Sequence, residues 1–338
     1  MRTSEPRFPP RQSARAFVAP WSIPYTTAAS EFLYGYSVVL AAIKANHRKL
    51  YNLYIHPRAE RNEGYAVLER VAKNARINLK HVDDSWLPLM DKMSSGRPHN
   101  GCIVETSPLP RPPIASLGAA SMESNSFQVT LSHQSREDAD INGSKEHYTY
   151  PSSSWRHPFI LYADGVTDEG NLGGIIRSAY FLGVDAIALP TRTSAPITHI
   201  ALKASAGAAE AIPIFAVADP TGFLRDSSDA GWCIYASDAP TPIPSAPGGF
   251  GTQLDATPAA ERKAAPRHPT ILMLGSEGSG IKSSLMAKAH FKVGIRGARV
   301  SDEVGVDSLN VSTAAAMLCG EFMRRPVVEK GGKEGFLF

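Results

Sequence analysis

The second half of the chain alternates short apolar runs with stretches of helical periodicity. The runs are apolar at successive positions, which is typical of parallel strands buried on both faces. Between them, apolar residues recur on one helix face, as at Ile175, Ile176 and Ala179. The pattern predicts an α/β domain whose parallel sheet is covered on both faces. Strands are expected at 158–162, 186–189, 212–217, 232–236 and 271–274, and helices at 175–182, 200–208 and 281–289.

A smaller α/β unit precedes this domain. Val38, Val39, Ala42 and Ile43 fit one helix face, and the apolar run 50–55 follows as a strand. A second helix is expected at 65–72, with further strands at 79–82 and 101–105. We therefore expect two domains, at 30–106 and 158–325.

Two stretches lose all periodicity. Residues 107–157 and 238–268 are rich in Pro, Ser and Ala, a composition that favours loops over packed elements. The first is expected to be a flexible linker, and the second a disordered insertion in the larger domain. Residues 326–338 are expected to be a tail.

Composition narrows the functional classes. The 338 residues include 35 Lys and Arg against 32 Asp and Glu, which excludes a uniformly basic coat for nucleic acid but allows local patches. No apolar run is long enough to span a membrane. The cysteines Cys102, Cys233 and Cys319 lie far apart, and the histidines show no paired spacing, so neither a disulfide framework nor a metal site is expected.

The first 29 residues have a composition of their own. Arg2, Arg7, Arg11 and Arg15 occur with serines and a single acid, Glu5, which is typical of an organellar transit peptide. An ordinary disordered terminus is the alternative, because several prolines would break a long amphipathic helix. On the first interpretation the protein is mitochondrial.

Residues 164–177 form the first loop that could carry chemistry. The loop follows a strand and opens a helix, where open α/β sheets bind ligands. Asn171 stands where a helix N-cap is expected, and Arg177 lies off the buried stripe of the helix. The glycines do not form the dinucleotide-binding pattern GxGxxG.

A second and a third loop follow. In 275–283, Gly275 and Gly280 have the spacing of a phosphate-binding loop, but Ile281 stands where its lysine must be and Glu277 places a negative charge inside it. In 305–318, Ser308 or Asn310 can cap a helix with an apolar face. Each loop alone is equally explained as a turn or a capped helix.

The order of the three loops is more specific. Asn171 with Arg177, then GSEGSGI, then SLNVS at 308–312 resemble the three signature motifs of SpoU-type RNA ribose 2′-O-methyltransferases of the SPOUT class. The resemblance covers 158–325 and implies a trefoil knot beside the parallel sheet. The small domain resembles a ribosomal-protein-like RNA-binding domain. The segments 31–35 and 96–101 further resemble the mitochondrial large-subunit rRNA guanosine 2′-O-methyltransferases. Glu169 stands where this family usually has Pro.

The resemblance implies S-adenosylmethionine as methyl donor and a ribose 2′-hydroxyl as acceptor, in a guanosine of mitochondrial large-subunit rRNA. It places Arg177 at the hydroxyl, as a base or, because an arginine is a poor base, as an orienting group that also holds a phosphate. Asn171 and Glu277 would fix Arg177 and the ribose, and Ser308 and Asn310 would line the same cleft. Gly275, Ile295 and Leu309 would hold the cofactor. The family also implies a homodimer.

RNA affinity must come from local clusters, because the net charge is only +3. Arg48 and Lys49, with Lys44 and His47, end the first helix, and Arg97 and His99 precede the last strand of the small domain. Arg177, Lys282 and Arg296 would extend this track. A catalytically silent ribosome assembly factor and a tRNA ribose methyltransferase remain as alternatives.

Overall fold

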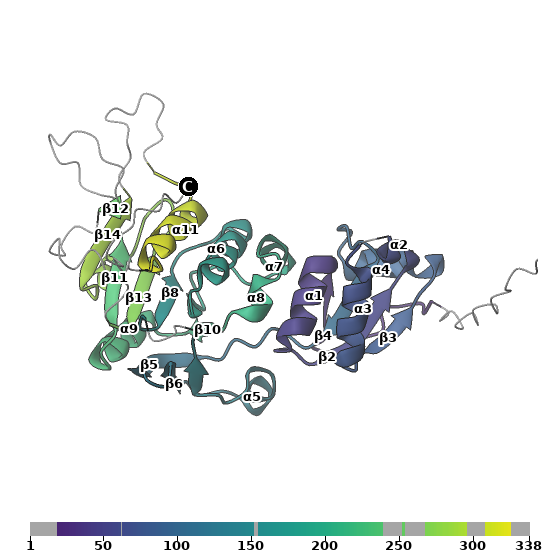
Figure 1. The fold of residues 1–338 in the computed structure, drawn as a ribbon, viewed down its shortest axis with the longest axis horizontal. Helices are drawn as coiled ribbons and strands as arrows, with labels where there is room; N and C mark the ends of the chain where they lie inside the picture. The colour runs from purple at the N-terminus through teal and green to yellow at the C-terminus, as the bar shows by residue number, and fades with distance from the viewer. Residues whose placement is uncertain are drawn as a thin grey trace, which may run out of the picture. The chain divides into compact units, whose positions relative to one another are not determined.

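The computed structural model describes residues 19–61, 63–151, 155–238, 252–253, 268–295 and 308–325 (Figure 1). The chain divides into two compact units, with the boundary between Pro108 and Leu109. None of the helices in these ranges is both long and apolar enough to cross a membrane.

The first unit is a small α/β domain, as predicted. Its sheet has the strand order β1-β4-β2-β3, in which β2 and β3 are parallel and β4 runs antiparallel to both of its neighbours. Helix α1 places Val38, Val39, Ala42 and Ile43 in the core, as the periodicity predicts. The elements are β1 (Glu31–Tyr34), α1 (Tyr36–Ala45), β2 (Leu50–Ile55), α2 (Pro57–Glu60), α3 (Tyr65–Asn74), β3 (Asn78–His81), the 3₁₀ turn Asp84–Trp86, α4 (Leu87–Met93) and β4 (Cys102–Thr106).

Residues 19–30 belong to this folded unit. Ala19 and Ile23 pack against its aromatic core, and the backbone N–H and the hydroxyl of Thr26 both donate to Glu105. Glu105 is fully buried in β4, so its carboxylate requires such donors. The prediction of a disordered terminus is therefore wrong for 19–29. The rest of the predicted transit peptide, residues 1–18, lies outside the described residues.

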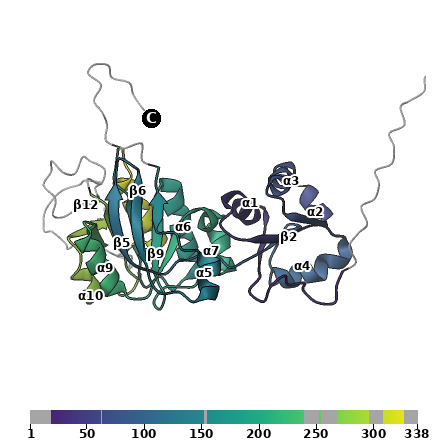
Figure 2. The same cartoon turned by 90° about the horizontal axis from the view of Figure 1, so that it is seen from below.

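The second unit contains the predicted parallel sheet. Six parallel strands follow the order β10-β9-β8-β13-β11-β14, and β12 (Thr252–Gln253) pairs antiparallel with β14 at the edge. Helices α6, α7, α8 and α11 lie on one face, and α9 and α10 lie on the other (Figures 1 and 2). The strands are β8 (Phe159–Ala163), β9 (Ala186–Pro190), β10 (Ile214–Val217), β11 (Cys233–Ser237), β13 (Thr270–Leu274) and β14 (Phe291–Ile295). The helices are α6 (Glu169–Leu182), α7 (His199–Ala204), α8 (Ala208–Ala211), α9 (Pro220–Asp229), α10 (Ser283–Met286) and α11 (Val311–Phe322). This confirms the predicted fold class, whereas the trefoil knot stays a prediction.

The prediction of a flexible linker at 107–157 is wrong. Strands β5 (Ile114–Ser121), β6 (Ser126–Leu131) and β7 (His147–Thr149) form an antiparallel sheet, accompanied by α5 (Arg136–Asn142). This small sheet covers the α9 face of the parallel sheet (Figure 2).

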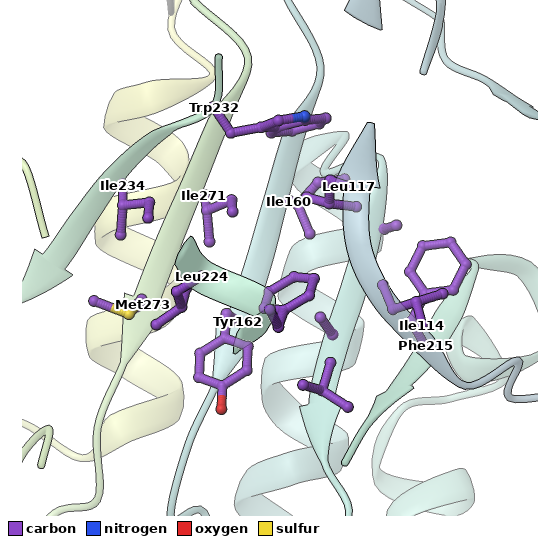
Figure 3. Close-up of a cluster of buried hydrophobic side chains, with 14 of the residues drawn as sticks. Ile114, Leu117, Ile160, Tyr162, Phe215, Leu224, Trp232, Ile234, Ile271 and Met273 are labelled. Carbon is purple, nitrogen blue, oxygen red and sulfur yellow. The ribbon is translucent and has the colours of Figure 1, made fainter. Parts of the chain in front are cut away.

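A shared core explains why the small sheet is ordered. Leu117 and Phe127 are fully buried in one cluster with Ile160 and Phe215 of the parallel sheet. Leu117, Ile160 and Phe215 are labelled in Figure 3. Two hydrogen bonds reinforce the contact: Trp232 Nε1 donates to the Gly118 carbonyl across 2.8 Å, and Leu117 N donates to Ser227 Oγ across 2.9 Å. The small sheet therefore buries an apolar face that α9 and α10 leave uncovered.

Several predictions fall outside the described residues. These concern the tail 326–338, the RNA candidate Arg296 and most of the predicted disordered insertion. Within 238–268 the structure describes only Asp238, the strand residues 252–253 and His268.

Candidate functional site

Three loops that are distant in sequence meet at one edge of the second unit. Strands β8 and β13 are neighbours, and the loops 164–168 and 275–280 follow their carboxyl ends. Residues 308–310 lead into α11, which packs beside α6. The structure thus brings together the first, second and third loops of the sequence pattern.

Asp168, not Asn171, caps helix α6. The Asp168 carboxylate accepts a hydrogen bond of 2.6 Å from the Asn171 backbone N–H, as an N-cap side chain does. Asn171 therefore lies in the first turn, and its side chain is free of capping. The helix begins three residues earlier than a cap at Asn171 would imply, because aspartate is an equally good cap.

Asn171, Glu277 and Asn310 form a closed hydrogen-bond cluster. Asn310 Nδ2 lies 2.9 Å from Asn171 Oδ1 and 2.8 Å from Glu277 Oε1. Asn171 Nδ2 lies 3.2 Å from the same Glu277 oxygen. Each of the three loops supplies one member, so the arrangement requires all three loops to be in place.

Glu277 also has a structural role. Its Oε1 accepts a hydrogen bond of 2.9 Å from Val311 N, so the carboxylate stabilises the start of α11 as an anion at a helix N-terminus does. The loop is tightly closed, since Ser276 and Gly280 exchange two backbone hydrogen bonds of 3.2 and 3.0 Å. Among the described residues, no donor reaches Glu277 Oε2, and the side chain is exposed. This second oxygen can accept a hydrogen bond from a ligand.

Asn310 is held on both sides. Its Oδ1 accepts from the backbone N–H and from the hydroxyl of Ser312, at 3.0 and 2.6 Å, which makes Asn310 the N-cap of α11. The capping therefore falls to Asn310 rather than Ser308, which is exposed just before it.

Arg177 is not part of this cluster. Six helical residues place it about 120° around α6 from Asn171, so the two side chains diverge. It is exposed and forms no hydrogen bond or ion pair with Asn171 or Glu277, which corrects the expectation that these residues fix it within one chain. It shares the outer face of α6 with Phe181, whose exposed fraction is 85%.

The predicted cofactor residues lie at the same edge of the sheet. Gly275 directly follows β13, and Ile295 ends β14. Leu309, with an exposed fraction of 46%, precedes α11. The stretches 164–171, 275–280 and 308–310 contain four carboxylates and no Lys or Arg, so they suit a neutral or positively charged ligand.

Other kinds of site find no support in the described part of the chain. It contains no group of three or more His, Cys, Asp or Glu arranged to hold a metal ion. Burial raises the pKa of both Cys102 and Cys319 to about 12, which keeps these thiols protonated.

Two of the predicted RNA-binding residues are buried. The Arg48 side chain is 1% exposed, where its Nη1 meets a Glu31 oxygen at 2.6 Å and the Ser107 carbonyl at 3.0 Å. His99 lies in the core near Asp91, and burial lowers its pKa despite the opposing effect of that carboxylate. Both predictions are corrected, because these side chains are committed to the fold of the small unit. Lys49 is exposed and Arg97 is half-buried.

Comparison with known proteins identifies the family. The model of the SpoU rRNA Methylase family matches residues 158–320, and a model described as RNA 2′-O ribose methyltransferase substrate binding matches 32–112. A protein named rRNA methyltransferase 1, mitochondrial, from Schizosaccharomyces pombe is 31% identical over 86% of this chain and 88% of its own length. The chain belongs to the SpoU rRNA methylase family. This confirms the resemblance carried by the three motifs.

Two further comparisons find similar proteins. The protein of the same name from Homo sapiens is 29% identical, over 86% of this chain and 72% of its own length. The crystal structure of an AdoMet-bound rRNA methyltransferase from Sinorhizobium meliloti has the same fold, with a TM-score of 0.56 and 19% identity over 87% of each chain.

Proposed function

We propose that this protein transfers a methyl group from S-adenosylmethionine to a ribose 2′-hydroxyl of RNA, at a guanosine of mitochondrial large-subunit rRNA. The observation that carries the proposal is the cluster of Asn171, Glu277 and Asn310, in which each SpoU motif contributes one polar side chain. All three motif positions carry a polar side chain that joins the cluster, which argues against a catalytically silent assembly factor.

The loops fit the cofactor chemically. S-adenosylmethionine carries a positive sulfonium, and the surrounding stretches hold carboxylates and amides without a lysine or arginine. Gly275, Ile295 and Leu309 would hold the adenine and methionine parts. When bound, the cofactor supplies an electrophilic methyl group.

The remaining requirement is to position the ribose and to remove its hydroxyl proton. Glu277 Oε2 is open to a ribose hydroxyl, while Asn171 and Asn310 hold Oε1 and so fix the direction of the carboxylate. Ser308 lies beside this group and would contact the same nucleotide. Arg177 would orient the 2′-hydroxyl and neutralise an adjacent phosphate, since a guanidinium keeps its proton at neutral pH and is a poor base.

A homodimer explains the placement of Arg177. Tyr180 and Phe181 on α6 and Met317 on α11 are exposed large apolar side chains, and the two helices pack side by side. Such a patch is typical of a protein interface. Pairing two copies through it would enclose Arg177 at the interface, where it could act together with loops of the second copy.

RNA contact by the small unit is proposed at its Lys49 end, with Arg97 as a second point. Lys44 and His47 at the end of α1 are exposed near Lys49, and Arg76 just past α3 lies at the same end because α1 and α3 both precede parallel strands. No pattern in the sequence points to Arg76, which lies between the end of α3 at Asn74 and the start of β3 at Asn78.

Mapping 2′-O-methyl groups in total RNA, with and without the protein, tests the substrate. In RNA from cells without the protein, we expect one guanosine of mitochondrial large-subunit rRNA to lack its 2′-O-methyl group. A site lost from tRNA would favour the tRNA methyltransferase, and an unchanged map with a ribosome assembly defect would favour the silent factor. A fusion of residues 1–30 to a fluorescent reporter tests the mitochondrial compartment, and a cytosolic reporter would contradict it.

A further inference from the structure

The loop between β9 and α7, residues 191–198, is hydrogen-bonded to the chain at 163–166, where the first of the three loops begins. Ser194 Oγ donates to the Ala163 carbonyl across 2.8 Å, and Ala195 N donates to the Val166 carbonyl across 2.7 Å. The Thr193 hydroxyl donates to the carboxylate of Asp164, which is buried. The loop 191–198, which has no part in the three motifs, therefore sets the path of the chain between β8 and α6.

A fourth contact, at the end of this loop, joins the starts of two helices. The Thr198 hydroxyl donates to Glu169 Oε2, and the same oxygen of Thr198 accepts from Ile200 N across 3.2 Å. Thr198 is the N-cap of α7, and Glu169 is the first residue of α6. Through one hydroxyl, the first turn of α6 is tied to the first turn of α7.

The bodies of the two helices are equally close. A Cβ atom at Gly173 would lie 2.5 Å from the Ala201 carbonyl oxygen and 2.5 Å from the Ala204 Cβ, so α6 touches α7 through its backbone. Because packed interiors respond to shifts of a fraction of an ångström, α7 serves as a rigid support for α6.

We propose that Glu169 and Thr198 are a positioning pair, which fixes the first turn of α6 so that the Asn171 amide meets Glu277 and Asn310. The proposal rests on the proposed methyl transfer and adds a role for two residues outside the hydrogen-bond cluster. Asn171 lies two residues after Glu169, and its backbone N–H is held by Asp168 at 2.6 Å. The Asp168 cap fixes where the helix begins, and the Glu169 contact fixes how its first turn is oriented.

Helix stabilisation alone is the competing explanation, since a carboxylate in a first turn interacts favourably with the helix dipole. That explanation requires only the charge of Glu169. The positioning role requires a hydrogen-bond acceptor, which glutamine retains without the charge. Glu169→Ala and Glu169→Gln therefore separate the two explanations.

The test measures kcat and the KM of each substrate for methyl transfer, with one substrate varied while the other is saturating, together with the Tm of each variant. We expect Glu169→Ala to lower kcat about tenfold with little change in either KM, because a misplaced polar group costs rate more than binding. Glu169→Gln should stay within about threefold of the wild type. Thr198→Val should match Glu169→Ala, Thr198→Ser should restore the rate, and the double variant should be no worse than either single loss.

Amide hydrogen exchange over 164–171 gives a readout that does not depend on activity. Exchange in this segment should accelerate in Glu169→Ala and return to the wild-type rate in Glu169→Gln. Unchanged kcat or unchanged exchange in Glu169→Ala, equal losses in the Ala and Gln variants, or additive losses in the double variant would overturn the proposal. A wild-type protein that methylates no RNA would instead refute the proposed function, and the exchange result would still decide the structural tie.

Discussion

Asn310 Nδ2 donates to Asn171 Oδ1 across 2.9 Å, although 139 positions separate the two residues along the chain. Both amides also bond Glu277 Oε1, so each position of the triangle depends on the other two. A hydrogen-bonded network of this kind fixes its members more firmly than separate pairs do. The site is therefore sensitive to small changes in any of the three loops.

Arg177→Ala should leave S-adenosylmethionine binding near normal and reduce methyl transfer by at least about 100-fold, the scale of a lost transition-state contact. Arg177 makes no hydrogen bond to the cluster, so the cluster should remain intact in the variant. Calorimetry with the cofactor and a tritium-transfer assay measure the two effects. Arg225→Ala is the matched control, because Arg225 is an exposed arginine on α9, across the sheet, paired with Asp226 at 2.7 Å. Near-wild-type transfer by Arg177→Ala would remove Arg177 from the reaction.

Asn310→Asp separates the helix cap from the cluster. Aspartate caps as well as asparagine does, but it loses the donor that serves Asn171 and places a carboxylate about 3 Å from Glu277. At neutral pH the two charges repel, so transfer should fall by about 100-fold. The repulsion raises the pKa of the carboxylate pair, and a proton shared by the pair removes it as the pH falls. Activity relative to the wild type should therefore recover toward pH 5 in Asn310→Asp and not in Asn310→Ala. A pH–rate profile without that difference would contradict the assigned geometry.

The sequence predicts the parallel sheet but not the small sheet that covers it. The strand Thr270–Leu274 is apolar at four successive positions, 271–274, so a parallel sheet buried on both faces follows from pattern alone. The outward direction of Arg177 likewise follows from the buried stripe of α6. In 107–157 the apolar residues that pack, such as Leu117 and Phe127, are separated by Ser, Ala and Gly, and the surface they cover comes from strands far along the chain. No local pattern carries that information.

The buried cation Arg48 shows a second limit. In the sequence it stands beside Lys44 and Lys49 as one more basic residue. Its partner Glu31 lies in β1 and its other acceptor, the Ser107 carbonyl, lies beyond β4, so only the folded sheet reveals the pair. Charge clusters in a sequence predict an RNA-binding surface only after buried ion pairs have been removed from them.

Asp185→Ala should destabilise the second unit by about 3–5 kcal/mol, because it leaves a buried cation without its partner. The two side chains are each 1% exposed, and Arg156 bonds both Asp185 oxygens, at 2.5 and 2.8 Å. Asp185 also accepts from Phe159 N across 2.8 Å, so the loss affects the first residue of β8. Urea unfolding measures the change, with Asp138→Ala on the exposed helix α5 as the control. A change below about 1 kcal/mol would mean that water replaces the carboxylate.

The segment 19–30 should behave as part of the small unit and not as a removable leader. Removing residues 1–18 should leave the urea midpoint of this unit unchanged, whereas removing 1–29 should lower its stability by several kcal/mol. The larger deletion strips the fully buried Glu105 of both Thr26 donors and uncovers the core beneath Ala19 and Ile23. A hydrogen bond to a buried charge contributes about 1.5–3 kcal/mol, so Thr26→Val in the full chain should reproduce part of the loss. The fluorescence of Trp86, buried in the same core, reports the unfolding. Equal midpoints for the two deletions would contradict the prediction, because residues 19–29 would then be dispensable for the fold. The expected difference would mean that a processing enzyme can remove residues 1–18 but not residues 1–29 without loss of stability.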